Sequence, residues 1–283
     1  MTTAREKYSA LKARLTPLLG EGEAEGAARI LMEDIAGFDW RKLFADGDRT
    51  LLDFTLAKLD AAADRIVAGE PVQYAVGRAR FCGMDLEVSP AVLIPRPETE
   101  GLVDIIVDRL GSRRDLHGLD VCTGSGCIAI ALARALPFSS IEACDISDEA
   151  LAIALINAGK LAQGIELFKA DALNLPAPAT PTFDFIVSNP PYVLPSEKAS
   201  MDARVLDHEP ALALFVPEDK PLLFYEAIAS YARDALRPEG SLFFEINETQ
   251  GRPMAKMLSD AGFRDVEILK DYTGRDRYAI ALR

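Results

Sequence analysis

The residues with the clearest chemical potential form the run Ser188-Asn189-Pro190-Pro191-Tyr192. Two consecutive prolines fix φ at about −65° and remove two backbone N–H donors, so the loop is stiff and its carbonyl groups remain as acceptors. The side-chain oxygen of Asn189 joins these carbonyls, and Tyr192 adds a flat ring. Such a cluster suits a planar group that carries two N–H donors, namely a carboxamide or an exocyclic amine. The alternative for an isolated Asn-Pro-Pro is a simple proline-rich turn.

This run follows an apolar segment at residues 183–187, which predicts a buried strand. Open α/β sheets bind ligands at the carboxyl ends of their strands, so we expect the run at that edge. From residue 116 onward the pattern alternates strand and helix, as in a doubly wound sheet. The strand at 118–122 is followed by Thr123-Gly124-Ser125-Gly126 and a helix from Cys127. A glycine-rich turn there lets backbone N–H groups approach a ligand closely.

Two further strands are predicted to end in acidic residues. The strand at 140–144 ends at Asp145, whose carboxylate could accept hydrogen bonds from two ribose hydroxyls. The strand at 166–169 ends at Asp171-Ala172, where a side chain could meet the amine of an adenine. The turn alone would suggest NAD(P), although the third glycine of that motif is missing. Taken together, these strand ends and the Asn-Pro-Pro-Tyr loop resemble the class I S-adenosylmethionine-dependent methyltransferases that act on amino and amide nitrogens.

The remaining elements complete this picture. Ser147 is expected to cap a helix that runs to Leu161, and Pro97 to occupy the first turn of another. Residues 194–221 form a long polar segment, interpreted as a lid or substrate-shaping loop. Beyond it we expect a helix to about residue 236, a strand at 241–245, a helix through Met254, and strands at 263–269 and 277–282. A strand, a turn and a strand at the end predict an antiparallel last strand.

The domain organisation follows from the same patterns. Residues 1–70 are predicted to form a helical bundle, because apolar residues such as Leu52, Leu56, Leu59, Ala63 and Ile66 recur at helical spacing. Residues 71–95 are predicted to be a linking hairpin, with extended segments from residue 73, and residues 96–283 the catalytic domain. The bundle is interpreted either as a stabilising appendage or as a module that docks the substrate.

The overall composition and charge argue against several classes of protein. A net charge of −13, from 31 basic and 44 acidic residues, argues against a general nucleic-acid binder. The four cysteines form no CxxC pair and there are only two histidines, so no metal site is expected. Residues 1–19 lack the apolar core of a signal peptide, and no apolar run could span a bilayer. We therefore expect a cytoplasmic protein without a membrane partner.

Several motifs resemble those of the HemK-type protein-(glutamine-N5) methyltransferases, and the resemblance spans nearly the whole chain. These motifs are Gly69-Glu70-Pro71-Val72-Gln73-Tyr74, Phe81-Cys82-Gly83, Ile94-Pro95-Arg96-Pro97-Glu98-Thr99-Glu100, Leu119 to Gly126, Asn189 to Tyr192, Glu209 to Leu214 and Gly274-Arg275-Asp276-Arg277. In that family the substrate is the glutamine of the Gly-Gly-Gln loop of peptide-chain release factors. Cys122 stands where the family often has glycine, and Ala172 offers no aromatic face to an adenine.

The resemblance also implies roles for single residues. Asn189 Oδ1 and the Pro190 carbonyl would accept the N–H groups of the substrate amide, with Pro191 and Tyr192 shaping the pocket. The cofactor would lie against the following residues: Arg96, Cys122, Thr123, Gly124, Ser125, Gly126, Asp145, Asp171, Ala172 and Asn189.

Three alternatives stay open at this point. They are a methyltransferase for a ribosomal-protein glutamine, an adenine-N6 DNA methyltransferase, and a degenerate methyltransferase retained as a binding module. The unbroken Pro-Arg-Pro-Glu-Thr-Glu run and the Gly-Arg-Asp-Arg ending favour the release-factor branch.

Overall fold

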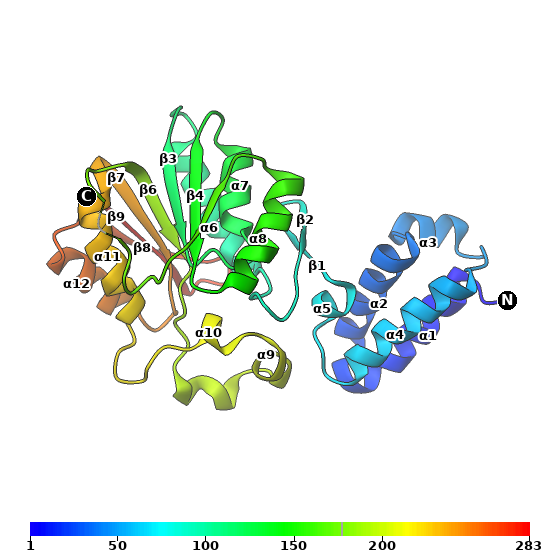
Figure 1. Ribbon diagram of the computed structural model, residues 1–283. Helices are drawn as coiled ribbons and strands as arrows, with labels where there is room; N and C mark the ends of the chain where they lie inside the picture. Colours follow the sequence, from blue (N-terminus) through cyan, green and yellow to red (C-terminus); the bar gives the residue numbers. More distant parts are fainter. Residues whose placement is uncertain (177) are drawn as a thin grey trace. The chain divides into compact units, whose positions relative to one another are not determined.

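The computed structural model describes residues 1–176 and 178–283, and these form two units (Figure 1). One unit consists of Met1–Arg78 together with Asp202–His208, and the other of Ala79–Met201 together with Glu209–Arg283. The chain therefore leaves the second unit after residue 201 and returns to it at residue 209.

The first unit is helical. Its helices are α1 (Ala4–Leu19), α2 (Glu21–Ala36), α3 (Trp40–Asp46), α4 (Asp53–Val67), α5 (Val72–Val76) and α9 (Ala203–His208). Helix α1 begins with a capping box, in which Thr3 Oγ1 accepts from Glu6 N at 3.2 Å and Glu6 Oε2 accepts from Thr3 N at 2.8 Å. The buried core of this helical unit contains Leu11 and Leu15 of α1 and Leu59 of α4. Leu52, expected on the buried face of α4, is instead 76% exposed, because it is the residue before the helix begins.

The second unit is built around a seven-stranded sheet with the order β5-β4-β3-β6-β7-β9-β8. Its strands are β3 (His117–Val121), β4 (Ser140–Asp145), β5 (Glu166–Lys169), β6 (Phe183–Ser188), β7 (Leu236–Glu245), β8 (Arg264–Lys270) and β9 (Asp276–Leu282). Strands β3 to β7 pair in parallel, whereas β9 is antiparallel to both of its neighbours. The predicted antiparallel last strand is confirmed.

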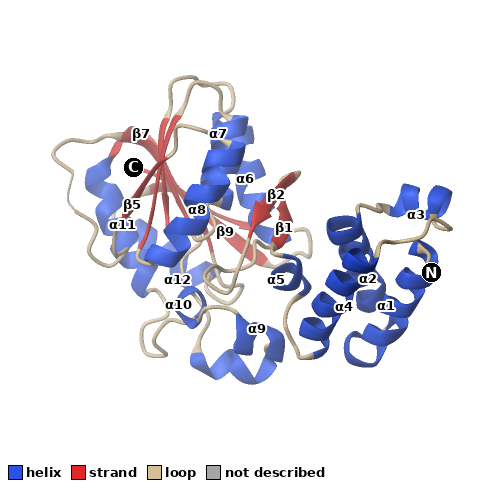
Figure 2. Ribbon diagram, turned by 45° about the vertical axis from the view of Figure 1, so that its right-hand side comes forward, coloured by secondary structure: helices blue, strands red, loops and turns tan. Residues whose placement is uncertain are grey.

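Helices cover both faces of this sheet, as Figure 2 shows. They are α6 (Pro97–Leu110), α7 (Cys127–Ala135), α8 (Asp148–Leu161), α11 (Leu223–Ala235) and α12 (Gly251–Asp260). Alternate strand residues face opposite layers, as the period of two requires. Phe185 and Val187 of β6 join the buried cluster with α6 and α7, and Ile186 joins the cluster with α11 and α12. Both faces of β6 are therefore buried, which explains its continuous apolar sequence.

The segment between β6 and β7 is more ordered than a plain loop. It contains η1 (Pro195–Ser200), α9 and α10 (Ala211–Leu214) before α11 begins. Pro97 and Ser147 take their expected places: Pro97 is the first residue of α6, and the Ser147 side chain accepts from Ala150 N.

The expected hairpin at residues 73–92 is partly wrong. A two-stranded ribbon does form from β1 (Arg78–Phe81) and β2 (Met84–Glu87), but helix α5 precedes it. The Arg65 guanidinium donates to the carbonyl oxygens of Tyr74 and Ala75 at 3.1 Å, and so caps α5 at its C-terminal end. None of the helices in the described part of the chain has the length and apolarity needed to cross a bilayer.

Candidate active site

A pocket of about 460 Å³ lies in the second unit, where the carboxyl ends of the parallel strands meet. Ten of the residues expected at the site line it: Arg96, Cys122, Thr123, Gly124, Ser125, Asp145, Asp171, Ala172, Asn189 and Pro191. Gly126, Pro190 and Tyr192, the other three, are described but are not part of its lining. Residues that were not predicted to belong to the site also line it, among them Thr99, Ile146, Leu212 and Phe224.

The glycine-rich turn forms one wall of the pocket. Gly124 has φ +55° and no atom within 4 Å of where a Cβ would stand, so its backbone is open to a ligand. Gly126 has φ +81° and is the N-cap residue of helix α7, so the N-terminus of that helix lies at the turn. Cys122 adopts φ +63°, a left-handed conformation that favours glycine.

The buried side chain of Asp120 holds the glycine-rich turn in place through hydrogen bonds. Its Oδ2 accepts from Thr123 Oγ1 at 2.6 Å and from Ala129 N at 3.2 Å, whereas its Oδ1 has no partner among the described residues. Burial raises the pKa of Asp120 to about 7, although the two hydrogen bonds oppose this rise. The carboxyl group therefore links the end of β3 to the first turn of α7.

The carboxylates of Asp145 and Asp171 also line the pocket. Asp145 Oδ2 accepts from Gly124 N at 2.9 Å and Oδ1 from Ser147 N at 3.0 Å, which ties the end of β4 to the glycine-rich turn. Asp171 accepts from Leu173 N and from Asn174 Nδ2, each at 2.9 Å, and so fixes the turn after β5. Each oxygen keeps one lone pair for a ligand.

The Asn-Pro-Pro-Tyr loop forms the opposite wall. Ser188 at the end of β6 is fully buried and donates to the Val121 carbonyl at 2.6 Å, which joins the loop to β3. Asn189 is half-buried at the pocket, and its Nδ2 donates to Thr99 Oγ1 at 3.3 Å. The Oδ1 end of the amide is therefore the end left for a ligand.

A buried glutamate lies behind this loop. Glu245 ends β7 and is 1% exposed; its Oε2 accepts from Thr99 Oγ1 at 2.7 Å and its Oε1 from Tyr192 OH at 3.1 Å. Burial raises the pKa of Glu245, while its hydrogen bond from Thr99 and the charge of Arg277 oppose the rise. Burial also raises the pKa of Tyr192 far above its usual value. Tyr192 is thus a hydrogen-bond donor behind the pocket.

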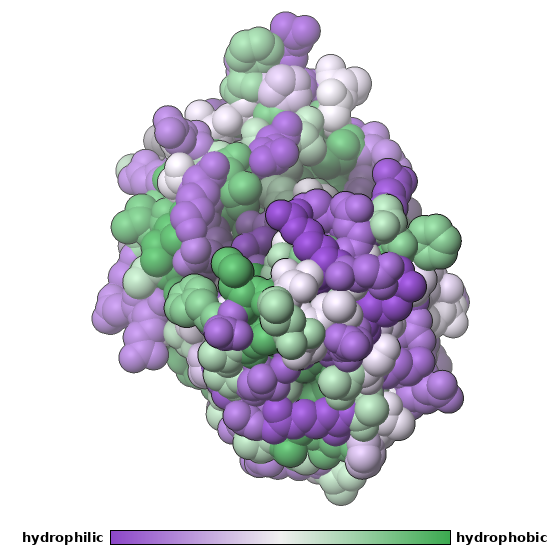
Figure 3. Space-filling model, turned by 90° about the vertical axis from the view of Figure 1, so that its right-hand side faces the viewer, coloured by the Kyte–Doolittle hydropathy of each residue, from purple (hydrophilic) through white to green (hydrophobic). Residues whose placement is uncertain are grey.

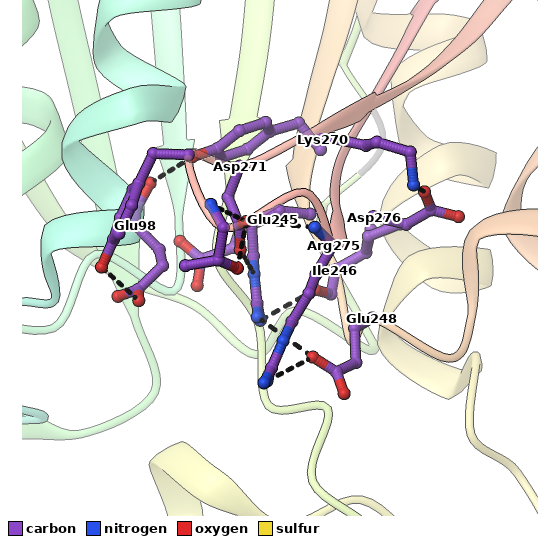
Figure 4. Close-up of polar contacts among 12 residues, drawn as sticks. Glu98, Glu245, Ile246, Glu248, Lys270, Asp271, Arg275 and Asp276 are labelled. Atoms are coloured by element: carbon purple, nitrogen blue, oxygen red, sulfur yellow. Dashed lines mark hydrogen bonds and ion pairs between the residues drawn. The ribbon is translucent and has the colours of Figure 1, made fainter.

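Strand β9 supplies Arg277 to this cluster, and the turn that joins β8 to β9 holds its guanidinium. Asp271 Oδ1 accepts from Thr273 and from Arg275 N, and its Oδ2 accepts from Arg277 Nε at 3.3 Å. Figure 4 shows the polar contacts around this turn, with Glu245, Asp271 and Arg275 among the labelled residues. The hydrogen bonds from Thr273 are the main reason that the pKa of Asp271 is lowered. The Gly-Arg-Asp-Arg motif is therefore structural: its residues Arg275 and Arg277 donate hydrogen bonds to Asp271 and fix the turn between β8 and β9.

Arg96 has a partner that the sequence did not reveal. Its guanidinium pairs with Glu209, whose other oxygen accepts from Ile94 N at 3.1 Å. The side chain of Glu209 is only 1% exposed. Glu209 therefore joins the segment after the Asn-Pro-Pro-Tyr loop to the segment that leads into α6, and both segments line the pocket.

The sheet, its two helical layers and the position of the pocket define a class I S-adenosylmethionine-dependent methyltransferase. The fold is similar to that of a solved methyltransferase from Pyrococcus furiosus, with a TM-score of 0.51 and 19% identity, over 77% of this chain and 96% of that one. Residues 101–208 match the family model of the methyltransferase small domain, and residues 10–77 match that of the PrmC N-terminal domain.

Similar proteins identify the family within this class of methyltransferases. The chain is 43% identical to the release factor glutamine methyltransferase of Bacteroides thetaiotaomicron, over 92% of this chain and 93% of that protein. It is 37% identical to that of Flavobacterium psychrophilum, over 93% of each chain. The chain belongs to the release factor glutamine methyltransferase family, as the motifs of its sequence predicted.

The residues of the pocket fit S-adenosylmethionine, the cofactor of this class. The open backbone at Gly124 offers N–H groups and carbonyls to a charged end, and the Asp145 carboxylate can accept from hydroxyl groups. Ile146, Ala172 and Leu173 provide apolar surface for a flat ring. These features agree with a ligand that has a zwitterionic end, a ribose and a base.

Proposed function

We propose that this chain methylates the side-chain nitrogen of the glutamine in the Gly-Gly-Gln loop of peptide-chain release factors. The observation that carries the proposal is the position of Asn189, whose amide lines the pocket and has its Nδ2 held by Thr99. Membership of the family supports the substrate. Because release factors act at the ribosome, the proposal implies a cytoplasmic reaction.

The chain must overcome the weak nucleophilicity of an amide nitrogen, whose lone pair is delocalised into the carbonyl. S-adenosylmethionine, when bound, supplies an electrophilic methyl group. Asn189 Oδ1 and the Pro190 carbonyl accept the two N–H groups and so orient the nitrogen. These hydrogen bonds strengthen as positive charge develops on nitrogen, so they stabilise the transition state more than the ground state. Positioning of the reactants contributes on the order of 7–11 kcal/mol to lowering the barrier.

The remaining site residues hold the cofactor in this proposal. The turn from Cys122 to Gly126 binds its amino-acid part, and Asp145 binds the ribose hydroxyls. Asp171 and Ala172 border the base. Arg96, fixed by Glu209, lines the same pocket and would help to close it. Pro191 and Tyr192 keep the acceptor loop rigid.

The helical unit is proposed to dock the protein substrate. It exposes several large apolar side chains, namely Leu18, Trp40, Phe44, Leu52, Phe54 and Val67. Figure 3 shows hydrophobic side chains gathered in separate groups among hydrophilic ones on one face of the molecule. Exposed aromatic side chains are typical anchors of protein interfaces.

The test is a methyl-transfer assay with labelled S-adenosylmethionine, in which purified release factor, ribosomal proteins and DNA are offered in parallel. Mass spectrometry then locates the added methyl group. We expect label on the Gly-Gly-Gln glutamine alone, and none on a release factor in which that glutamine is replaced by glutamate. Label only on a ribosomal protein or on DNA would overturn the proposed substrate.

The role of Asn189 is tested in the same assay with Asn189→Ala. Removal of a hydrogen-bonding group that stabilises the transition state lowers turnover by about 10²–10³-fold, and we expect a loss of this size. Cofactor affinity, measured separately by calorimetry, separates a loss of turnover from a loss of binding. Turnover near that of the wild type would contradict the assigned role.

A further inference from the structure

The orientation of the Asn189 amide decides whether the loop can accept a substrate N–H. A carboxamide has one acceptor end and one donor end of almost equal size. With Nδ2 toward the pocket, Asn189 would present N–H groups to the N–H groups of the substrate. This inference rests on the proposed role of Asn189 and asks what holds its amide in the productive orientation.

Thr99 makes the contact that distinguishes the two ends. It is 2% exposed, lies in the first turn of α6, and its Oγ1 stands 3.3 Å from Asn189 Nδ2 and 2.7 Å from Glu245 Oε2. A hydroxyl group has one proton to donate, and an ionised carboxylate has none. When Glu245 is ionised, the Thr99 proton therefore goes to Glu245, so Thr99 can only accept from Asn189. Only the Nδ2 end of Asn189 can satisfy it.

Glu245 is itself held in place from its other side. Tyr192, three residues after Asn189, donates to Oε1 at 3.1 Å, so both carboxylate oxygens accept from hydroxyl groups. Arg277 lies beside this cluster, with Nε 3.3 Å from Asp271 Oδ2 and Nη1 3.4 Å from the carbonyl of Ile246, the residue after Glu245. Burial is the larger effect and raises the pKa of Glu245, whereas the positive charge of Arg277 opposes this rise and favours the ionised form.

We propose that Glu245 and Thr99 are positioning residues, which orient the Asn189 amide so that Oδ1 faces the substrate. Glu245 acts on the Asn189 amide through Thr99, since its carboxylate is buried behind the loop and Glu245 itself is not part of the pocket lining. Asp271, which directly follows β8, contributes by holding Arg277 of the Gly-Arg-Asp-Arg motif, whose charge acts on Glu245.

The direction of these hydrogen bonds depends on the charge of Glu245. Protonated Glu245 could donate to Thr99, which would then donate to Asn189 and favour the reversed amide. Burial raises the pKa of Glu245, so this change occurs at a higher pH than for an ordinary glutamate. The titratable and charged groups around it come from α6, the Asn-Pro-Pro-Tyr loop, α11 and β9: Glu98, Tyr192, Tyr225, Arg277 and Tyr278.

The test compares Thr99→Val, which keeps the shape but removes the hydroxyl, with Thr99→Ser, which keeps the hydroxyl. We expect Thr99→Val to lower kcat on intact release factor by about 10²-fold, the cost of a misplaced catalytic group. The KM for release factor and the Kd of S-adenosylmethionine should change little. Thr99→Ser should retain most of the activity. Equal kcat values for the two variants would overturn the proposal, and thermal unfolding of both shows that the fold is intact.

Glu245→Gln provides a second test that does not depend on Thr99 substitution. Its Oε1 can still accept from Thr99, so activity should persist, whereas the acid-side decline of kcat in the wild type should disappear. An unchanged acid-side decline would overturn the role of Glu245.

Asn189→Ala separates this inference from the proposed function. Full activity of Asn189→Ala would remove the basis of both. An inactive Asn189→Ala with a fully active Thr99→Val would overturn the positioning role alone. If the inference holds, adding Thr99→Val to Asn189→Ala should cause little further loss, because the two residues act as one unit.

Discussion

At the scale of single residues, the buried carboxyl group of Asp120 is a group whose ionisation is costly to the fold around the pocket. It has no exposed surface, and its Oδ1 has no partner among the described residues. Burial raises its pKa from 3.8 to about 7, and the charge of Asp145 adds to the rise. In the unfolded chain the group ionises at its ordinary pKa. The folded protein therefore holds more protons than the unfolded chain between these two values.

This difference makes a prediction about pH and stability. A group whose pKa is raised by folding stabilises the fold fully below its unfolded pKa and loses that contribution as pH rises through its folded pKa. Relative to Asp120→Asn, the free energy of unfolding of the wild type should fall by about 2 kcal/mol between pH 5.5 and pH 8.5. Asparagine keeps an oxygen that can accept from Thr123 and Ala129. Urea unfolding of both cofactor-free proteins at several pH values measures the difference.

The comparison with Asp120→Asn serves as its own control, because every other titrating group is common to the two proteins and cancels. If the two proteins lose stability in parallel as pH rises, the pKa of Asp120 is not raised by folding. Above pH 8.5 the difference should become constant, since the group is then ionised in both states.

At the scale of the elements, close packing between β3 and β6 fixes the centre of the sheet. Gly118 is paired in register with Phe185 on the neighbouring strand, and both residues are buried. A Cβ on Gly118 would stand 2.1 Å from Cζ of the Phe185 ring, which cannot move away within a filled core. The glycine is therefore needed for its lack of a side chain.

Gly118→Ala should accordingly destabilise the protein by about 1–3 kcal/mol, the usual cost of overpacking a core. The matched control is Gly159→Ala, on the exposed side of α8, where no atom lies within 4 Å of the added methyl group. That control should stabilise by about 0.5–1 kcal/mol, because alanine favours helix over glycine. Denaturant unfolding of the two variants checks the opposite signs, and a stabilising Gly118→Ala would contradict the packing argument.

The elements were largely predictable from the sequence because their periodicity reflects which faces are buried. The strands predicted at 140–144, 166–169 and 183–187 are examples, since β4, β5 and β6 match them to within one residue, and the N-cap at Ser147 is another. Helix α5 was not predictable, because its stability depends on Arg65, which caps it from another helix. The need for glycine at position 118 could not be predicted from the local sequence either, since its neighbour Phe185 lies 67 residues further along the chain.

The same distinction applies to the candidate site. Asn189, Asp145 and the glycine-rich turn were predictable, because each follows a recognisable strand and carries its chemistry in adjacent residues. Thr99 and Glu245 were not singled out, since their importance comes from one buried hydrogen bond between residues 146 positions apart. Such long-range partners are set by tertiary packing, which periodicity does not encode.

At the scale of the whole molecule, the segment between β6 and β7 belongs to both units. Residues 202–208 group with the helical unit, whereas Glu209 and α10 belong to the unit that contains the pocket. Within the helical unit, Arg204 pairs with Glu23 of α2 and with Asp202. The next residues along the chain hold Arg96 through Glu209 and line the pocket through α10. The chain thus connects an ion pair in one unit to the pocket wall of the other.

This connection predicts that a change at Arg204 alters cofactor binding, although Arg204 does not line the pocket. Arg204→Glu places three carboxylates together and loosens α9, and partly exposed ion pairs of this kind contribute about 0.2–1 kcal/mol. The Kd of S-adenosylmethionine should therefore rise by about threefold, and the double variant Glu23→Arg/Arg204→Glu should recover most of the loss. Lys256→Glu, which breaks an exposed ion pair with Asp260 on α12, changes the net charge equally and is the matched control. Calorimetric titration measures the Kd of S-adenosylmethionine for the wild type and the three variants. An equal rise of this Kd in Lys256→Glu would show a general effect of net charge. A double variant that binds the cofactor as weakly as Arg204→Glu would show that the ion pair does not hold α9.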